Sequence, residues 1–144
     1  MTLTWRLAEK NDEAALINLW RDSVRATHDF LSETDQRTIE KNLPHYFEHV
    51  QLKVWQEENQ LIGFSGTAEN SLEMLFLSPE YFGRGYGNQI LQQLMEDDGI
   101  TKIDVNEDNP RALRFYQKNG FKVASRSPLD DDGRPYPILH LEKA

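Results

Sequence analysis

The chain has 144 residues, of which 38% are hydrophobic and 28% are charged, a length and composition that suit one soluble globular domain. The formal net charge of -8 argues against nonspecific binding to nucleic acid, and it is compatible with a cationic partner such as an amine. The sequence has no cysteine, which excludes disulfides, thiolate metal ligands and a cysteine nucleophile.

The first part of the chain predicts one strand followed by helices. A short strand is expected at residues 3–8, and a helix at residues 11–27, where apolar side chains recur four residues apart. A second helical pattern covers residues 34–49. Because Pro44 lies inside this pattern and an interior proline removes a backbone hydrogen bond, we expect two short helices there.

The middle of the chain predicts three strands, one around Val54 and two at residues 61–67 and 72–77. The turns between them are short and polar, which favours antiparallel pairing. A loop at residues 79–86 then leads into a helix at residues 87–97, whose apolar side chains form one stripe.

The last part predicts a strand at residues 100–105, a helix that Asn109 caps, and two final strands at residues 121–127 and 136–141. The alternation of strands and helices along the whole chain indicates an α/β fold with a central sheet. The acidic stretch at residues 130–132 offers too few ligands in register for calcium, and we expect a solvated hairpin loop there.

No internal repeat, low-complexity segment or linker interrupts these elements, so we expect a single domain over residues 1–144. No apolar stretch approaches the roughly 20 residues of a membrane span, and the first residues lack the apolar run of a secretion signal. We therefore expect a cytoplasmic protein. The four histidines show no ligand spacing, and the sequence predicts no metal site.

A glycine-rich turn separates the third central strand from the next helix, with the sequence Phe82-Gly83-Arg84-Gly85-Tyr86-Gly87. Glycines let the backbone approach a ligand, and a helix start offers unpaired N–H groups to an anion such as a pyrophosphate. A plain structural turn is the other interpretation of three glycines. The turn lacks the Gly-Lys-Ser/Thr of a P-loop, and its spacing differs from the Gly-x-Gly-x-x-Gly of a dinucleotide turn.

A second motif reaches from Val105 to Phe121 and reads VNEDNPRALRFYQKNGF. Taken alone it is a strand end, a capped helix and a glycine stop, and its aromatic residues Phe115 and Tyr116 could belong to the core. The two motifs together resemble the acetyl-CoA signatures of the GNAT N-acetyltransferase superfamily, Gln/Arg-x-x-Gly-x-Gly/Ala and Val-Asn-x-x-Asn-x-x-Ala-x-x-Phe-Tyr-x-x-x-Gly-Phe. The segments ATHDFL at residues 26–31 and GRPYP at residues 133–137 resemble small bacterial members.

The resemblance covers essentially the whole chain and implies a mixed central sheet of about six to seven strands flanked by about four helices. It implies an enzyme that moves an acetyl group from acetyl-CoA to a small-molecule or protein amine by direct attack, without a metal. A non-catalytic domain that binds CoA or acetyl-CoA as a sensor is the alternative. Such a protein could also form a homodimer through an exposed final strand.

The resemblance also assigns residues to the cofactor. The strand before the turn would pair with the pantetheine arm, the turn would hold the pyrophosphate, and two asparagines would approach from the other side. These residues are Leu75, Phe76, Leu77, Phe82, Gly83, Arg84, Gly85, Tyr86, Gly87, Asn88, Asn106 and Asn109. Phe82 departs from the family pattern, which has Gln or Arg there, so backbone N–H groups and Arg84 would have to bind the pyrophosphate.

The resemblance places Tyr116 beside the cofactor sulfur, where it would protonate the departing thiolate, and a backbone N–H near Leu75 would stabilise the oxyanion. Glu73 matches a glutamate that some relatives use as a general base. An exposed strand residue or a structural ion pair is an equally good interpretation of Glu73. His28 follows the first helix in a region that often lines the acceptor site, although it could also be a surface histidine at a helix end.

Overall fold

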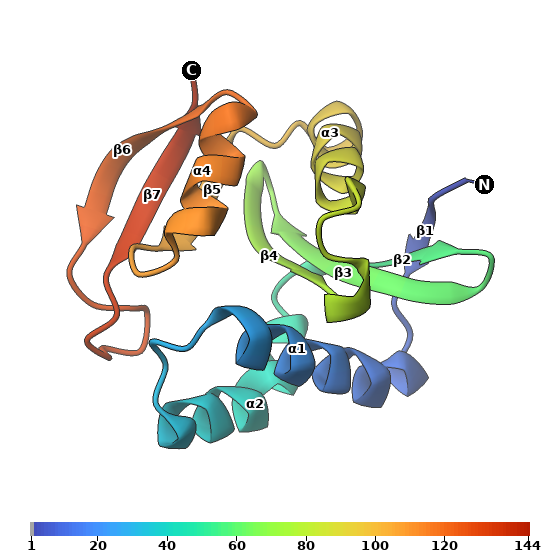
Figure 1. Cartoon of the computed structure of the whole chain (residues 1–144), viewed down its shortest axis with the longest axis horizontal. Coiled ribbons are helices and arrows are strands. Elements are labelled where there is room, and N and C mark those ends of the chain that lie inside the picture. The colour runs from blue at the N-terminus through green and yellow to red at the C-terminus, as the bar shows by residue number, and fades with distance from the viewer. Residues whose placement is uncertain (1) are drawn as a thin grey trace.

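The computed structural model describes residues 2–144, in which seven strands form one sheet in the order β1-β2-β3-β4-β5-β7-β6 (Figure 1). Neighbouring strands are antiparallel except for β4 and β5, which are parallel, so the sheet is mixed. The strands are β1 (Thr4–Leu7), β2 (Gln51–Glu57), β3 (Gln60–Ala68), β4 (Ser71–Leu77), β5 (Lys102–Asn106), β6 (Phe121–Ser127) and β7 (Ile138–Lys143).

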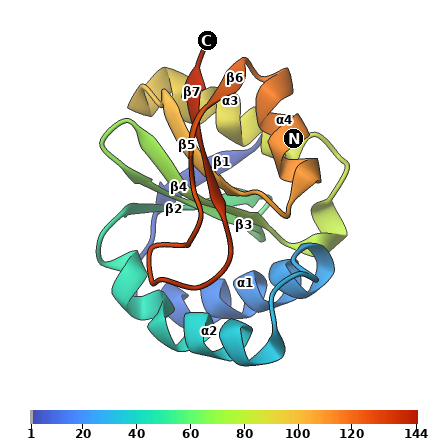
Figure 2. The same cartoon turned by 90° about the vertical axis from the view of Figure 1, so that its left-hand side faces the viewer.

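Helices cover both faces of this sheet. The α-helices within residues 2–144 are α1 (Glu13–Thr27), α2 (Glu33–Phe47), α3 (Tyr86–Asp98) and α4 (Pro110–Lys118), and two short 3-10 turns lie at Lys10–Asp12 and Pro79–Tyr81. As Figures 1 and 2 show, α1 and α2 lie on one face, and α3 and α4 lie on the other. None of these helices is long and apolar enough to cross a membrane.

Each face has its own core. Leu16 of α1 packs in a buried cluster with Phe64 of β3, and Leu91 of α3 packs in a second cluster with Ile103 of β5. The alternation of strand side chains supplies apolar residues to both faces of the sheet. The observed layers confirm the expected α/β fold, with a mixed sheet of the expected size and the expected set of helices.

α2 is one continuous helix, so the prediction of two short helices over residues 34–49 is wrong. Pro44 lies in its last turn, and the side chains of Leu43 and Phe47 beside it are buried in the core under α1. Burial of the two side chains stabilises the helix by roughly 1.5–3 kcal/mol each, which offsets the roughly 3 kcal/mol cost of an interior proline.

The final strand is not at an edge of the sheet. β7 lies between β5 and β6 and is hydrogen-bonded to both, so the expectation that an exposed final strand is available for a homodimer is wrong. The chain returns from β6 by a loop at residues 128–137 and inserts its last strand inside the sheet. The edges within residues 2–144 are therefore β1 and β6.

β4 contains a bulge at Glu73. Gly66 of β3 is opposite Met74 and Thr67 is opposite Leu72, which leaves Glu73 as the extra residue. The bulge shifts the alternation of β4, so that Leu72 packs under α3 and α4 whereas Met74 packs on the α1 side.

β4 and β5 separate at the same place. Their parallel pairing covers only Ser71 opposite Lys102 and Leu72 opposite Ile103. Beyond these pairs β5 continues with β7, and the edge of β4 from Glu73 to Leu77 that faces β5 makes no strand pairing within residues 2–144. An unpaired strand edge carries free N–H and C=O groups that can bind an extended ligand.

Candidate active site

A cavity of about 470 Å³ lies where β4 and β5 separate. Four segments that are far apart in the sequence form its wall: the end of α1, the second half of β4, the glycine turn and the first two turns of α4. We call it the turn cavity. Its lining residues are Ser23, Thr27, His28, Leu75, Phe76, Leu77, Phe82, Gly83, Gly85, Gly87, Asn88, Asn109, Arg111, Ala112, Phe115 and Tyr116.

The glycine turn has the backbone conformation that the sequence pattern suggests. Gly83 has φ 72° and Gly85 has φ 85°, and Gly85 is the N-cap of α3. A Cβ atom at either position would meet nothing within 4 Å, so backbone conformation rather than space requires glycine at these two positions. The first N–H groups of α3 have no partner within the helix, and together with the helix dipole they form an anion site.

Two side chains of the turn point elsewhere. The Arg84 guanidinium lies over the ring of Tyr81, 5.6 Å from its centre, and the Tyr86 hydroxyl donates a hydrogen bond of 3.0 Å to Glu57. Neither Arg84 nor Tyr86 lines the turn cavity, whereas Arg111 does. Arg111 of α4 is therefore the cationic side chain that lines this cavity.

Tyr116 is buried in the core under α4 and also lines the turn cavity. Burial raises the pKa of its hydroxyl, because an ionised phenolate would lose its hydration there. Tyr116 therefore keeps its proton at neutral pH, so its hydroxyl is available as a hydrogen-bond donor. Asn109 uses its side chain to cap α4, with its Oδ1 accepting a hydrogen bond of 3.2 Å from the N–H of Ala112.

His28 lies at the end of α1, with its ring 5.1 Å from Phe30 and 6.2 Å from Phe76. Its Nδ1 lies 2.6 Å from Oγ1 of Thr27. Burial lowers the pKa of His28 to about 4, so the imidazole is neutral at physiological pH. The structure thus places His28 at the turn cavity as an uncharged polar group.

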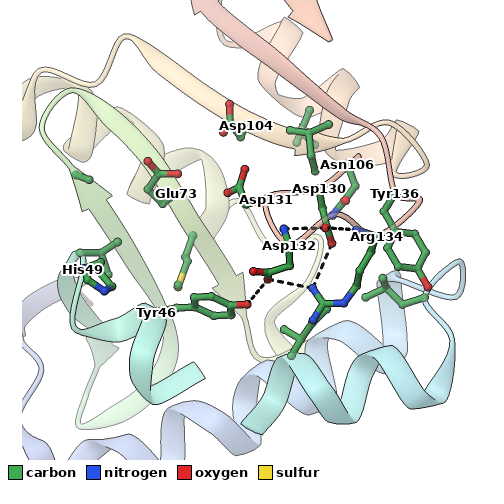
Figure 3. A pocket seen from close by; sticks show the side chains of 17 residues that line it. Tyr46, His49, Glu73, Asp104, Asn106, Asp130, Asp131, Asp132, Arg134 and Tyr136 are labelled. Atoms are coloured by element: carbon green, nitrogen blue, oxygen red, sulfur yellow. Dashed lines mark hydrogen bonds and ion pairs between the residues drawn. The ribbon is translucent and has the colours of Figure 1, made fainter. Parts of the chain in front are cut away.

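Glu73 and Met74 of β4 line a second cavity, of about 440 Å³ (Figure 3). We call it the acidic cavity because five carboxylates and one arginine line it. Its labelled side chains in Figure 3 come from α2 and the residues after it, from β4, β5 and the loop at residues 128–137. They are Tyr46, His49, Glu73, Asp104, Asn106, Asp130, Asp131, Asp132, Arg134 and Tyr136.

Glu73 and Asp104 extend into this cavity from neighbouring strands (Figure 3). Partial burial raises the pKa of the Glu73 carboxyl, and the negative charges of Asp104 and, to a smaller extent, Asp131 raise it further, while a hydrogen bond from Ser71 acts in the opposite direction. A carboxyl group whose pKa is raised is a stronger base once ionised. Glu73 has therefore the properties of a proton acceptor.

Ion pairs hold the loop at residues 128–137 against α2. Arg134, whose side chain is only 15% exposed, lies 3.1 Å from Asp132, 3.3 Å from Asp130 and 3.8 Å from Asp35 of α2. The expected hairpin loop is observed between β6 and β7, and Asp131 and Asp132 at its tip are exposed, whereas Asp130 is half-buried. All three aspartates also line the acidic cavity, so the loop borders that cavity.

With this geometry, comparison with known proteins identifies the family. A family model described as an acetyltransferase (GNAT) domain matches residues 48–123, which include the glycine turn and the whole of α4. The chain belongs to the GNAT acetyltransferases. This match includes both motifs that suggested the family.

Two relatives that are named as N-acetyltransferases align with 98% of the chain. It is 35% identical to the peptidyl-lysine N-acetyltransferase YjaB of Salmonella typhimurium, over 98% of each chain. YjaB of Escherichia coli is 34% identical, over 98% of this chain and 97% of the relative. The solution structure of the apo form of the Escherichia coli protein has a TM-score of 0.90 and is covered to 99%. The protein is thus an N-acetyltransferase that uses acetyl-CoA as its acetyl donor, and a non-catalytic sensor is not favoured.

The structure brings most of the predicted GNAT cofactor residues together. Those that line the turn cavity are Leu75, Phe76, Leu77, Phe82, Gly83, Gly85, Gly87, Asn88, Asn109 and Tyr116. Arg84 and Tyr86 lie outside it, and Asn106 lines the acidic cavity instead. Glu73 also lines the acidic cavity, so the two predicted catalytic residues line different cavities.

Sequence reasoning missed several lining residues. Arg111 lies within the second motif, at the second position of α4, where a cation faces the same cavity as the glycine turn. Asp104 alternates with the buried Ile103 and Val105 on β5, and that alternation indicates a polar side chain on the opposite face. No sequence pattern predicted that Arg134 lines a cavity, because this position depends on ion pairs with Asp35 of α2 and Asp130 of the loop.

Proposed function

We propose that this protein acetylates lysine side chains of proteins, with Glu73 as the base and Tyr116 as the proton donor to the thiolate. The observation that carries the proposal is the position of two adjoining cavities along one strand. Leu75 and Leu77 line the turn cavity, whereas Glu73 and Met74 line the acidic cavity. An acetyl group at Leu75 and an amine beside Glu73 would thus approach each other at the bulge of β4.

The turn cavity has the parts that acetyl-CoA requires. The open edge of β4 would pair with the amide groups of the pantetheine arm, and the N–H groups at the start of α3 would bind the pyrophosphate. Phe82 supplies no polar group there. Arg111 would supply, with a charge, the hydrogen-bonding side chain that the family pattern has at the head of the turn as Gln or Arg.

The acidic cavity fits a positively charged acceptor. Five carboxylates line it and Arg134 offsets only part of their charge, so an ammonium group is attracted before it reacts. The curated relatives that are 34–35% identical act on peptidyl-lysine, and they match this chain over its whole length. Both observations favour the ε-amino group of a lysine over a neutral or anionic acceptor.

The reaction requires no covalent enzyme intermediate. Glu73 would take one proton from the lysine ammonium, and the neutral amine would attack the thioester carbonyl. A backbone N–H near Leu75 would donate a hydrogen bond to the oxyanion. The C–N bond forms, the C–S bond breaks, and the second amine proton leaves with the collapse of the intermediate.

Tyr116 would act on the departing sulfur. A free thiol has a pKa near 8.5, below that of tyrosine, and burial raises the pKa of Tyr116 still further. Complete proton transfer from Tyr116 is therefore uphill. Its hydroxyl would stabilise the thiolate by donating a hydrogen bond, and the proton would cross as charge develops on the sulfur.

The experiment that tests this function measures the release of CoA thiol with a lysine peptide whose N-terminus is blocked. Mass spectrometry of the peptide locates the acetyl group, and the same peptide with arginine in place of lysine is the control. We expect acetyl-lysine to form, and the Tyr116→Phe variant to bind acetyl-CoA but to turn over about 100-fold more slowly. Absence of acetyl-lysine, or acetylation of a small polyamine instead, would overturn the proposal.

A further inference from the structure

A chain of hydrogen bonds leads away from the acidic cavity across three neighbouring strands. Nδ1 of His140 on β7 lies 2.7 Å from Oδ1 of Asp104 on β5. On the other side of the ring, Nε2 of His140 lies 2.7 Å from Oγ of Ser127 on β6. With a neutral imidazole, the Nδ1–H donates to Asp104 and Nε2 accepts from the Ser127 hydroxyl.

Strand register brings Asp104 to the proposed base. Leu72 of β4 is opposite Ile103 of β5 in the last parallel pair, so Glu73 and Asp104 are the first residues of each strand beyond it, where the two strands separate. Both line the acidic cavity, in which Figure 3 shows Glu73 on β4 and Asp104 on β5. Asp104 is thus the member of the hydrogen-bonded chain that shares the acidic cavity with Glu73.

We propose that Asp104 is a positioning residue that shares the acidic cavity with Glu73 and strengthens it as the base for the acceptor amine, and that His140 and Ser127 fix the orientation of the Asp104 carboxylate through their hydrogen bonds. The inference rests on the proposed function, since it concerns the base of that reaction. An anionic neighbour disfavours ionisation of a carboxyl group and strengthens the base that remains. The direction of the pKa shift at Glu73, to which Asp104 contributes, agrees with this arrangement.

The proton balance of the reaction explains why Glu73 would need the help of Asp104. A lysine ammonium and acetyl-CoA yield an amide, CoA thiol and one free proton, because the thiolate takes back only one of the two protons that the nitrogen loses. The other proton must pass through the base to solvent. A base that is too weak would leave the lysine protonated, whereas the charge of Asp104 makes Glu73 a better proton acceptor.

Other charged and titratable groups also face Glu73, and the test has to separate them from Asp104. They come from the C-terminal end of α2 and from the loop at residues 128–137, and they are Tyr46, His49, Asp130, Asp131, Asp132 and Arg134. None of these takes part in the hydrogen-bonded chain through His140. Variants of Asp104, His140 and Ser127 therefore form a set of their own.

The test compares pH profiles of kcat/KM for the lysine peptide. In Asp104→Asn the charge is lost, so the acid limb of the profile should move to lower pH and the plateau should fall about tenfold. His140→Leu should shift the limb in the same direction by less, and Ser127→Ala by the least. Glu142→Gln, two residues from His140 on β7, removes an exposed carboxylate outside the cavity and should leave the profile unchanged.

A second measurement does not depend on turnover. Carbon NMR of the Glu73 carboxyl during a pH titration should show its pKa falling in Asp104→Asn and, by less, in His140→Leu. An unchanged Glu73 pKa and an unchanged acid limb in folded variants would overturn the inference while leaving lysine acetylation intact. If the wild-type protein acetylates no lysine, the proposed function fails instead, and the NMR titration still decides whether Asp104 acts on Glu73.

Discussion

Phe82 and Arg111 line the same cavity, one from the glycine turn and the other from the first turn of α4. The turn carries an apolar side chain where its family has a polar one, and the helix brings a guanidinium to the same space. If acetyl-CoA binds in the turn cavity as we propose, Arg111 would take the place of the missing polar residue of the turn.

The first prediction concerns the proposed contact between Arg111 and the pyrophosphate of acetyl-CoA. Arg111→Ala should raise the KM for acetyl-CoA by about tenfold or more, because a hydrogen bond to a charged group contributes about 1.5–3 kcal/mol. The value of kcat should change much less. Steady-state kinetics at varied acetyl-CoA concentration measure both.

Arg114 provides the control for Arg111, since it is exposed on the same helix and does not line the cavity. Arg114→Ala should leave the KM for acetyl-CoA within twofold of the wild-type value. Equal effects of the two substitutions would mean that the general charge of α4, rather than a contact of Arg111, attracts the cofactor.

The second prediction separates strain from function in the glycine turn. Gly85 and Gly99 both have positive φ, at opposite ends of α3, and a Cβ atom at either one meets nothing within 4 Å. Alanine at either position should destabilise the fold by about 1 kcal/mol through the left-handed conformation. Urea denaturation measures that loss.

Of the pair Gly85 and Gly99, it is Gly85 that lines the turn cavity. Gly85→Ala should therefore weaken acetyl-CoA binding about tenfold, because the added methyl group keeps the pyrophosphate from the backbone N–H groups. Gly99→Ala should bind acetyl-CoA like the wild type, as isothermal calorimetry would show. Unimpaired binding by Gly85→Ala would place the pyrophosphate elsewhere.

Local patterns predicted the helices that border the turn cavity. The helix expected at residues 87–97 is observed at Tyr86–Asp98, because its apolar stripe and the glycines at both ends are encoded within the segment itself. The same holds for α4, where Asn109 caps the first turn and Gly120, with φ 92°, follows the end. Each of these features depends on residues no more than one or two turns apart.

Tertiary contacts decided the features that the sequence did not predict. Pro44 is tolerated because Leu43 and Phe47 are buried against α1, and no local rule reports that burial. Likewise, the acidic cavity exists only because β7 inserts beside β5 and brings its preceding loop over α2. Asp104 and Arg134 are far apart in the sequence and line one wall only in the folded chain.

The third prediction is a pH dependence of stability at the start of the chain. Asp12 accepts two hydrogen bonds from Arg6, of 2.7 and 2.8 Å, and these bonds lower its pKa to about 2. Because the folded pKa lies below the unfolded one, the pair stabilises the fold above pH about 4 and loses this effect as the pH falls through about 2.

Asp12→Asn should therefore lower the free energy of unfolding at pH 7 by about 1–2 kcal/mol, a figure reduced because the Arg6 side chain is 42% exposed. The difference from the wild type should vanish near pH 2. Asp22→Asn removes an exposed carboxylate of α1 that forms no ion pair within residues 2–144, and it serves as the control. A deficit that persists unchanged at low pH would show that packing, not charge, is lost.

The fourth prediction concerns the contact that holds the loop at residues 128–137, which borders the acidic cavity, against the start of α2. The Tyr136 hydroxyl donates a hydrogen bond to Asp35 and accepts one of 3.2 Å from the N–H of Ser32, while its ring packs edge-on against Phe30. Tyr136→Phe keeps the ring and removes both hydrogen bonds. We expect a loss of about 1 kcal/mol in stability and a KM for the lysine peptide that rises several-fold, because the loop at residues 128–137 is held less firmly.

Tyr86→Phe is the matched control for this substitution. Tyr86, like Tyr136, is half-buried, and its hydroxyl donates a hydrogen bond of 3.0 Å to Glu57. Tyr86 lines neither cavity. Its stability should fall by a similar amount, while the KM for the lysine peptide stays at the wild-type value. If both variants raise that KM equally, a general loss of stability explains the effect; if only Tyr136→Phe does, the tie between Tyr136 and Asp35 shapes the acceptor site.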